Sequence, residues 1–202
     1  MTQLLVATRS RGKQEEFRTL LAQLPCEIVF PDDIGMRESP EEQELEVHDT
    51  FEANARAKAQ WFASRSGLAT LADDSGLEVD ALGGAPGVRS KRFGGLGGLD
   101  HEVTAANNAK LLHALHRVAE GHRSARYRCV LVLIRPGSPE VVAVGTTEGQ
   151  IALSATGDGG FGYDPLFVSA ELGRSFGEAG PAAKHAVSHR ARAVEALAGR
   201  LA

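Results

Sequence analysis

Residues 71–79 constrain the fold of this chain most, because an apolar run there meets two aspartates, a serine and a glycine in succession. We predict a buried strand that stops at Asp73 and resumes through Val79. Two adjacent carboxylates at a strand end repel each other in a low-dielectric setting, and a bound cation or a proton removes that conflict. The alternative is a simple turn, since Asp, Ser and Gly all favour turns. The stretch alone leaves both interpretations open.

The composition is typical of one soluble globular domain. The 202 residues are 43% hydrophobic and 24% charged, with a formal net charge of −4. A dedicated nucleic-acid binder is usually basic, so we predict no nucleic-acid partner. No apolar run has the length of a membrane span and no signal peptide is recognised, so we predict no membrane association and a cytoplasmic location. Cys26 and Cys129 lie in apolar runs and are predicted to be free thiols.

The beginning of the chain indicates an anion-binding loop. Residues 3–7 are predicted to form a buried strand, and a helix follows the polar stretch at residues 8–13. A strand, a Ser/Gly/Lys loop and a helix place backbone N–H groups and a lysine at a helix N-terminus, where anions bind. The Walker spacing is absent. A plain connection between strand and helix remains the alternative.

The next region predicts a loop and then an amphipathic helix. Residues 31–46 are acidic and poor in apolar residues, which is typical of a loop. Asp49 and Glu52 are predicted to cap a helix that runs towards Ser64. Its core stripe is Phe51, Ala55, Ala59 and Phe62. Lys58 lies on a neighbouring stripe, either as a solvated lysine or as a second cation directed at the acids.

Two strands, at residues 127–134 and 141–146, are predicted to form an antiparallel hairpin. Strands that alternate with helices, together with one hairpin, predict a mixed α/β domain.

Residues 157–165 contain a literal G-x-G-x-x-G, but a proline follows at once and no strand–helix pair flanks it. We interpret the segment as a glycine-backed platform that presents Phe161 and Tyr163 at a surface where a flat ring can stack. An aromatic turn packed on the core has comparable weight.

The last helix is predicted to begin after Ser188 as its N-cap. His189 and Arg190 then lie in its first turn, where the helix dipole disfavours positive charge. Cations at this end of a helix suggest a functional reason.

Six motifs in this order and spacing resemble the inosine/xanthosine triphosphate pyrophosphatase family, and they extend over essentially the whole chain. They are Thr8-x-x-x-Gly12-Lys13, Thr50-Phe51-x-x-Asn54-Ala55-x-x-Lys58-Ala59, Ala72-Asp73-Asp74-Ser75-Gly76-Leu77, Gly84-Ala85-Pro86-Gly87-Val88, Phe161-Gly162-Tyr163-Asp164-Pro165 and Ser188-His189-Arg190.

The resemblance implies an α/β fold in which an elongated mixed sheet with flanking helices forms two lobes around a nucleotide cleft, as one domain over residues 1–202. It implies a homodimer. It also implies Mg²⁺-dependent hydrolysis of non-standard purine nucleoside triphosphates (ITP, dITP and XTP) to the monophosphate and pyrophosphate.

Carried over by position, the resemblance implies that Glu46 and Asp73 bind the metal, and that Asp74 is the general base and a further metal contact. Triphosphate contacts are implied at Thr8, Arg9, Ser10, Arg11, Gly12, Lys13, Lys58 and Ser75. Phe161 is implied as the residue that stacks on the base, with Gly162, Tyr163 and Asp164 in the same loop. The implied base-edge readers are Lys184, His189 and Arg190.

The sequence departs from the family at two places. The family's first loop usually reads Thr-Gly-Asn or Thr-Asn-Asn, whereas this chain has Thr-Arg-Ser with Arg9 in the middle. Arg89 and Phe93 stand where tyrosines are common. These departures concern affinity and substrate preference, and they leave room for a pyrophosphatase of modified pyrimidine or methylated nucleotides.

Two other functional classes are alternatives. A nucleotide-sensing module would bind without hydrolysis, but a passive binder of an anion gains nothing from two adjacent acids. A phosphate-monoester phosphatase is disfavoured because the chain lacks an Asp-x-Asp nucleophile pair.

Overall fold

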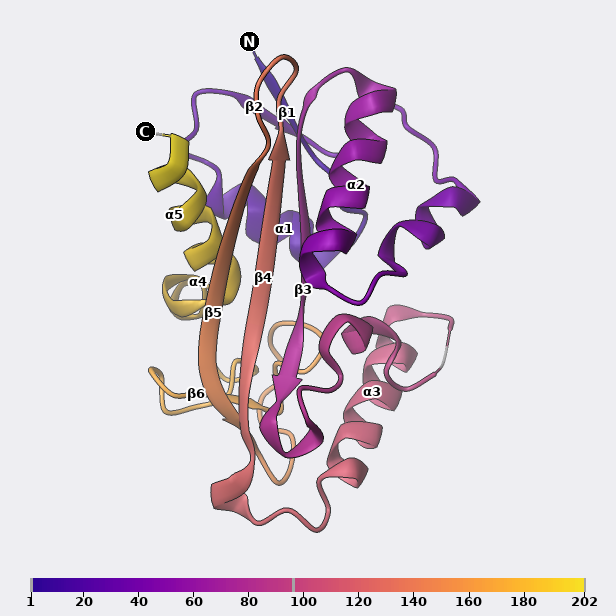
Figure 1. The fold of residues 1–202 in the computed structure, drawn as a ribbon. Coiled ribbons are helices and arrows are strands. Elements are labelled where there is room, and N and C mark those ends of the chain that lie inside the picture. Colours follow the sequence, from indigo (N-terminus) through magenta and orange to yellow (C-terminus); the bar gives the residue numbers. More distant parts are fainter. Residues whose placement is uncertain (1, 96, 202) are drawn as a thin grey trace. The chain divides into compact units, whose positions relative to one another are not determined.

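The computed structural model of this protein describes residues 2–95 and 97–201, which form a mixed α/β fold. Six strands make one sheet in the order β2-β1-β3-β4-β5-β6 (Figure 1). Strand β1 pairs in parallel with β2 and β3, whereas β5 and β6 are antiparallel, so the sheet is mixed as predicted. The strands are β1 (Gln3–Val6), β2 (Glu27–Val29), β3 (Ala69–Val79), β4 (Ser124–Ile134), β5 (Val141–Ile151) and β6 (Phe167–Ser169).

Five α-helices and four short 3₁₀ helices join the strands in the described residues. The α-helices are α1 (Arg11–Leu20), α2 (Phe51–Ser66), α3 (Asp100–Ala114), α4 (Pro181–Val187) and α5 (His189–Leu201). The 3₁₀ helices are η1 (Pro40–Glu46), η2 (Asp80–Leu82), η3 (Gly87–Arg92) and η4 (Glu120–His122).

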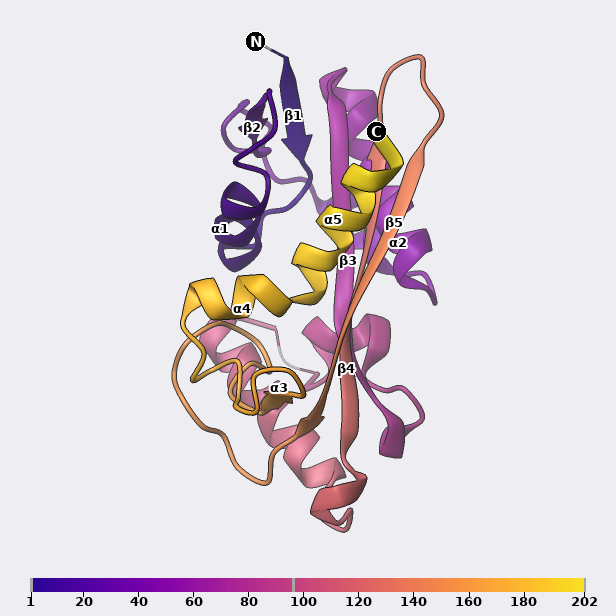
Figure 2. The ribbon, with the colours of Figure 1, turned by 90° about the vertical axis from the view of Figure 1, so that its left-hand side faces the viewer.

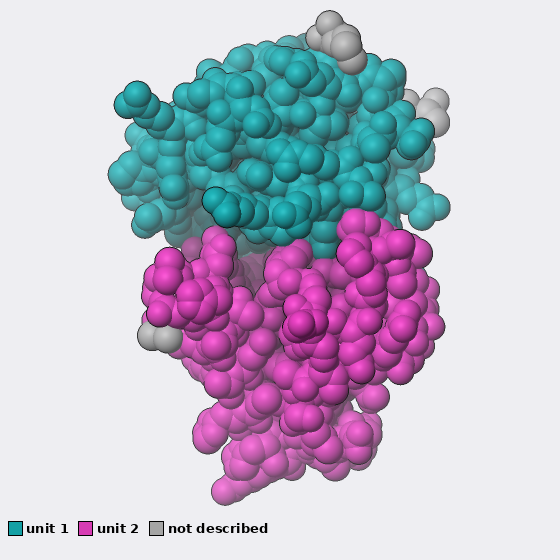
Figure 3. Space-filling view, turned by 180° about the vertical axis from the view of Figure 1, so that it is seen from behind, with its two compact units in different colours: residues 1–74, 129–145, 190–202 teal, residues 75–128, 146–189 magenta. Residues whose placement is uncertain are grey.

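The chain divides into two compact units, which Figure 3 colours separately. Unit 1 comprises residues 1–74, 129–145 and 190–202, and unit 2 comprises residues 75–128 and 146–189. Strands β3, β4 and β5 contribute residues to both units.

Unit 1 has a core on each face of its part of the sheet. Successive side chains of a strand point to opposite faces, so β1 gives Leu4 and Val6 to one core and Leu5 to the other. Helices α1 and α5 cover the first face and α2 covers the second, and α2 and α5 lie on opposite sides of the strands (Figures 1 and 2). The predicted core stripe of α2 is confirmed, since Phe51, Ala55, Ala59 and Phe62 are all buried.

The cap of α2 differs from the prediction. The Thr50 hydroxyl accepts a hydrogen bond from the Ala53 amide at 3.1 Å, so Thr50 and not Asp49 is the N-cap. Glu52 therefore lies too early in the helix to reciprocate, and it pairs with Arg56 at 2.6 Å instead.

Two predictions for unit 1 are corrected. Strand β3 continues through Asp73 and Asp74 without a break, so neither the predicted strand end nor the turn is present. The predicted loop at residues 31–46 contains η1, which is opened by a capping box between Ser39 and Glu42.

Unit 2 has its own core, in which α3 packs on its strands. The core is built from residues that include Leu77, Leu111, Leu115, Phe167 and Phe176. Strands β4 and β5 are sheet neighbours that run in opposite directions, so the predicted hairpin is confirmed, although both strands are longer than predicted (Figure 1).

Among the described helices, none is both long and apolar enough to cross a membrane. Both cysteines are free, as predicted; Cys129 is buried and Cys26 is half-buried.

Candidate active site

The predicted sequence of strand, loop and helix at the start of the chain is confirmed. Helix α1 begins at Arg11, directly after a loop in which the Ser10 amide donates to the Thr8 hydroxyl at 3.3 Å. The Gln14 side chain donates to the Thr8 carbonyl at 3.1 Å and so fixes the loop to the first turn of α1. No acidic residue lies in that first turn, which leaves its positive end suited to an anion.

Asp73 and Asp74 point to opposite faces of the sheet, because they are neighbours in one uninterrupted strand. Asp73 follows Leu71 on the face that α1 and α5 cover, and Asp74 follows Ala72 on the face that α2 covers. The repulsion expected of two adjacent acids is therefore relieved in part by their separation across the strand.

Asp73 is buried among cations from α1 and α5. Its Oδ2 lies 2.8 Å from Lys13 Nζ and 3.5 Å from Arg190 Nε. Arg190 also forms an ion pair with Glu16. Burial would raise the pKa of Asp73, but Lys13 and Arg190 outweigh it and hold the pKa well below its usual range. Asp73 is thus ionised at neutral pH.

Asp74 lies among residues of α2. Its Oδ2 accepts a hydrogen bond from the Asn54 side-chain amide at 2.8 Å. Burial is the largest influence on this carboxyl and raises its pKa, against the opposing effect of Lys58 and Lys13. The two neighbouring aspartates therefore differ: the pKa of Asp73 is lowered, and the pKa of Asp74 is raised.

Lys58 is a buried cation that forms an ion pair with Glu46 at the end of η1. The open question about Lys58 is settled by this placement, since its ammonium group is directed at acids. Lys58 lowers the pKa of Glu46 to about 2. We call Lys13, Glu46, Lys58, Asp73 and Asp74 the acid–lysine cluster.

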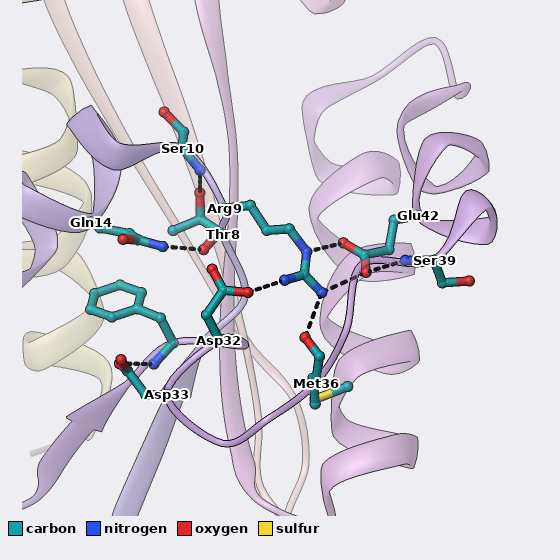
Figure 4. A network of polar contacts seen from close by, with 10 residues as sticks. Thr8, Arg9, Ser10, Gln14, Asp32, Asp33, Met36, Ser39 and Glu42 are labelled. Carbon is teal, nitrogen blue, oxygen red and sulfur yellow. Dashed lines mark hydrogen bonds and ion pairs between the residues drawn. The ribbon is translucent and has the colours of Figure 1, made fainter.

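Arg9 does not lie open to a ligand, in contrast to its implied role as a triphosphate contact. Its guanidinium binds Glu42 through two nitrogens at 2.7 and 2.8 Å, Asp32 at 2.5 Å and the Met36 carbonyl at 3.1 Å (Figure 4). The other implied contacts of this loop are placed as follows: Thr8 is buried, Ser10, Gly12 and Lys13 are half-buried, and Arg11 is exposed. Ser75 follows Asp74 in β3 and is half-buried.

The acid–lysine cluster fits a hard divalent cation in chemistry. Three carboxylates supply oxygen ligands of the kind that Mg²⁺ prefers, and Glu46 and Asp73 are already ionised. In the described part of the chain, however, no three His, Cys, Asp or Glu side chains are gathered closely enough to hold a metal. Lys13 and Lys58 each contact one of the carboxylates, Asp73 and Glu46 respectively.

A second cluster lies in unit 2, around Asp164. Its carboxylate accepts hydrogen bonds from Lys184 at 2.6 Å, from the Phe161 amide at 2.8 Å and from the Tyr127 hydroxyl at 3.2 Å. The Lys184 ammonium also lies 4.6 Å from the centroid of the Phe161 ring. We call Tyr127, Phe161, Asp164, Lys184 and His189 the aromatic-loop cluster.

The predicted surface position is confirmed for one of the two aromatic residues. Phe161 is 37% exposed, whereas Tyr163 is 4% exposed. The Tyr163 hydroxyl donates to the Ser90 carbonyl at 2.8 Å, so the prediction of a surface position is wrong for this residue. Gly160 has a φ of +72°, and a Cβ there would meet Asp164 Oδ2 at 2.1 Å, so only glycine fits. Gly162, also implied as a contact, accepts a hydrogen bond on its carbonyl from Asn108.

The three implied base-edge readers are divided. Lys184 lies in α4, not in the final helix, and His189 stacks on Tyr127 with ring centroids 4.7 Å apart. Arg190 contacts Glu16 and Asp73 in unit 1, so its observed partners are carboxylates of α1 and β3. Helix α5 begins at His189, so His189 and Arg190 lie in its first turn, as predicted.

Sequence reasoning missed three side chains that support these clusters: Asn54, Glu16 and Tyr127. Asn54 offered a signal, because it shares one stripe of α2 with Lys58. Glu16 lies 174 residues before Arg190, and no local pattern indicates that pairing.

Comparison with known proteins identifies the family. Residues 4–200 match the profile of the Ham1 family. The chain belongs to the Ham1 family. Two similar members are named dITP/XTP pyrophosphatase: one from Geobacter sulfurreducens, 45% identical, and one from Xanthomonas axonopodis pv. citri, 43% identical. Both alignments cover 100% of this chain, with 97% and 98% of the respective relatives.

Solved Ham1 structures share the fold. A HAM1 protein from Coxiella burnetii superposes with a TM-score of 0.84 at 34% identity, covering 100% of this chain and 98% of that one. A protein from Mycobacterium abscessus, described as a nucleoside-triphosphatase / dITP/XTP pyrophosphatase, has a TM-score of 0.73 at 41% identity, covering 97% and 98%. The resemblance seen in the six motifs is thereby confirmed.

Proposed function

We propose that this protein hydrolyses the non-standard purine nucleotides dITP, ITP and XTP to the monophosphate and pyrophosphate. Full-length similarity to relatives named dITP/XTP pyrophosphatase supports the substrate class. The structural observation that carries the proposal is the acid–lysine cluster, which combines an ionised carboxylate, a carboxylate of raised pKa and two lysines within one unit.

The two lysines would bind the triphosphate. In the structure they contact carboxylates, Lys13 with Asp73 and Lys58 with Glu46. A triphosphate carries more negative charge than a single carboxylate, so it would compete for both ammonium groups. Backbone N–H groups at the start of α1 would add further donors. Once the two lysines bind phosphate, their ammonium groups would spread the charge of the pyrophosphate leaving group.

The carboxylates that the lysines release would serve as metal ligands. We propose that Glu46 and Asp73 hold Mg²⁺, with Asp74 as a further contact. When bound, the ion would neutralise charge on the phosphate oxygens.

Asp74 would act as the general base. Burial raises its pKa towards the range in which a base works well near neutral pH. The Asn54 amide holds one carboxylate oxygen at 2.8 Å and so orients the group. Asp74 would take a proton from the attacking water as the water oxygen bonds to the α-phosphorus. The bond from that phosphorus to the bridging oxygen would break, and pyrophosphate would leave.

The aromatic-loop cluster would bind the base. Phe161 is 37% exposed, and its ring would stack on the base. A 6-keto oxygen can accept hydrogen bonds from Lys184, His189 or backbone N–H groups. The 6-amino group of adenine would leave such donors unpaired, and a mismatch of this kind costs orders of magnitude in specificity.

We also propose that the protein is a cytoplasmic homodimer, on the basis of the family resemblance and the two free thiols. Light scattering coupled to size-exclusion chromatography would give about twice the mass of the 21.4 kDa chain. A monomer mass at micromolar concentration would overturn the dimer.

A nucleotide panel with Mg²⁺, assayed for both pyrophosphate and orthophosphate, tests the function. We expect pyrophosphate from XTP, dITP and ITP, with ATP and GTP nearly inert. Pyrophosphate from a modified pyrimidine or methylated nucleotide alone would overturn the substrate assignment. Orthophosphate would show that a different bond is cut, and binding without any product would favour the nucleotide sensor.

A further inference from the structure

The segment that carries Glu46 has little structure of its own. Residues 31–46 form no strand and no α-helix, and η1 at the end of the segment has no buried residue. A few turn-type backbone hydrogen bonds support it, such as those from the Gly35 amide to Asp32 and from the Met36 amide to Pro31. Ile34, Met36 and Leu45 pack against the core that α2 covers, and polar side chains supply the remaining contacts that keep the segment closed.

Arg9, in the loop that precedes α1, makes polar contacts with this segment. Its planar guanidinium grips Glu42 with two parallel hydrogen bonds and reaches Asp32 and the Met36 carbonyl as well (Figure 4). The rigid fork of arginine suits such a bidentate contact, and lysine cannot reproduce it. The Arg9 side chain is 18% exposed and that of Glu42 is 13% exposed, so water screens this pair less than a surface pair.

Arg9 contacts both ends of the segment. Asp32 lies near its start, and Glu42 lies within η1, four residues before Glu46. The Glu42 side chain also accepts a hydrogen bond from the Ser39 amide at 3.1 Å. Arg9 therefore binds a residue of the capping box that begins η1. The backbone on either side of Arg9 is in turn fixed by the hydrogen bonds to Thr8.

We propose that Arg9 is a positioning residue. It fastens residues 31–46, which carry Glu46, to the loop before α1 and thereby sets the affinity of the site for its divalent metal. This inference rests on the proposed function, in which Glu46 is a metal ligand. The consequence is a coupling between the loop before α1 and η1, because Arg9 would transmit a change at Thr8 or Ser10 on phosphate binding to η1.

A second arginine provides a matched control. Arg65 of α2 contacts the same segment through Glu41 at 2.5 Å and lies over the Trp61 ring at 3.9 Å. Its side chain is 44% exposed, and its contacts within the described residues are to η1 and to Trp61 of α2. Substitution of Arg65 therefore removes a contact of η1 without breaking the connection that Arg9 makes.

The test compares Arg9→Ala, Arg9→Lys and Arg65→Ala with the wild-type full-length protein. The first readout is binding of Mn²⁺ without nucleotide, measured by electron paramagnetic resonance, and the second is amide hydrogen exchange over residues 33–46. For Arg9→Ala we expect Mn²⁺ affinity to fall about tenfold, as is usual when a residue that supports a metal ligand is lost. We expect exchange in the segment to accelerate about tenfold, with little change in β3.

Arg9→Lys should recover only part of both effects, because lysine lacks the fork, and Arg65→Ala should stay within about twofold of wild type. Equal effects of Arg9→Ala and Arg65→Ala would overturn the inference. So would a normal Mn²⁺ affinity and normal exchange in Arg9→Ala with a weakened affinity for nucleotide, since that result would make Arg9 a direct phosphate contact.

These outcomes are separable from failure of the proposed function. If the wild-type protein releases no pyrophosphate, the proposed function fails, while metal binding and hydrogen exchange still show whether Arg9 holds the segment. If pyrophosphate is released and Arg9→Ala binds Mn²⁺ like wild type, only the positioning role fails.

Discussion

The acid–lysine cluster of unit 1 and the aromatic-loop cluster of unit 2 both pair lysines with aspartates, but the pairs differ in accessibility. In unit 1 the side chains of Lys13 and Asp73 are 17% and 0% exposed, and those of Glu46 and Lys58 are 30% and 10% exposed. Lys184 and Asp164 are 6% and 3% exposed, and Asp164 is held further by Tyr127 and a backbone amide. Under the proposed function, the first pairs exchange partners with the triphosphate, whereas the second keeps its partners and supports a loop.

We therefore expect the lysines of the two clusters to have different roles. A buried ion pair is costly to break, so we expect Lys184 to support the loop that carries Phe161 in addition to its proposed contact with the base. Each pair of unit 1 has one partly exposed member, Lys13 or Glu46, and we expect a polyanion to displace the carboxylates there. Substitutions in the two clusters should therefore separate activity from stability.

Asp74→Asn should have the largest effect. Loss of the general base is expected to lower kcat by roughly 10²–10⁴-fold, because an amide cannot take the proton from water. The amide can still accept from Asn54, so the melting temperature should stay near that of wild type. Steady-state kinetics with XTP and a thermal melt measure both. Asp49→Asn, an exposed acid outside the cluster, is the control, and full activity of Asp74→Asn would remove Asp74 from the mechanism.

Lys13→Ala should reduce kcat/KM by about 10²-fold, since a donor to the developing phosphate charge is lost. Arg190 remains beside Asp73, so the carboxylate keeps a cation and the fold is retained. The measurement is kcat/KM for XTP, with the exposed Lys91→Ala as control. If Lys13→Ala greatly lowered stability and left kcat/KM unchanged, Lys13 would support the fold and would not bind the triphosphate.

Lys184→Met should affect stability more than chemistry. It leaves Asp164 buried without its cation, which typically destabilises a protein by about 3 kcal/mol. Chemical denaturation measures the free energy of unfolding, and the exposed Lys110→Ala should change it by less than about 0.5 kcal/mol. If Lys184→Met melts like wild type, Lys184 does not support the loop, and any loss of activity then comes from its proposed contact with the base alone.

Phe161→Ala should give the smallest change. We expect KM for XTP to rise about tenfold through lost stacking, with kcat within about twofold of wild type. Leu153→Ala removes another exposed apolar side chain of unit 2 and should leave KM unchanged. An unchanged KM in Phe161→Ala would exclude stacking on this ring.

Local patterns were sufficient to predict much of the fold. The apolar period of α2 and the polar break after β1 are local signals, and the structure confirms both elements. The capping box at Ser39 and Glu42 was also present in the sequence, but the acidic composition of residues 31–46 favoured a loop.

The errors arise where distant partners override local preference. Asp73 and Asp74 favour a turn, yet they lie in a continuous strand because Lys13, Arg190 and Asn54 stabilise them from three different helices. Arg9 shows the same limit: its motif position suggests phosphate, while its partners lie 23 to 33 residues further along the chain.

The most direct test of the exchange of partners is nuclear magnetic resonance of the lysine ammonium groups. The chain has only five lysines, namely Lys13, Lys58, Lys91, Lys110 and Lys184, so each signal can be assigned by one Lys→Arg substitution. On saturation with Mg²⁺ and a non-hydrolysable XTP analogue, the signals of Lys13 and Lys58 should shift most, because phosphate replaces Asp73 and Glu46 as their partner. Signals of both lysines that stay in place with the analogue bound would contradict the account.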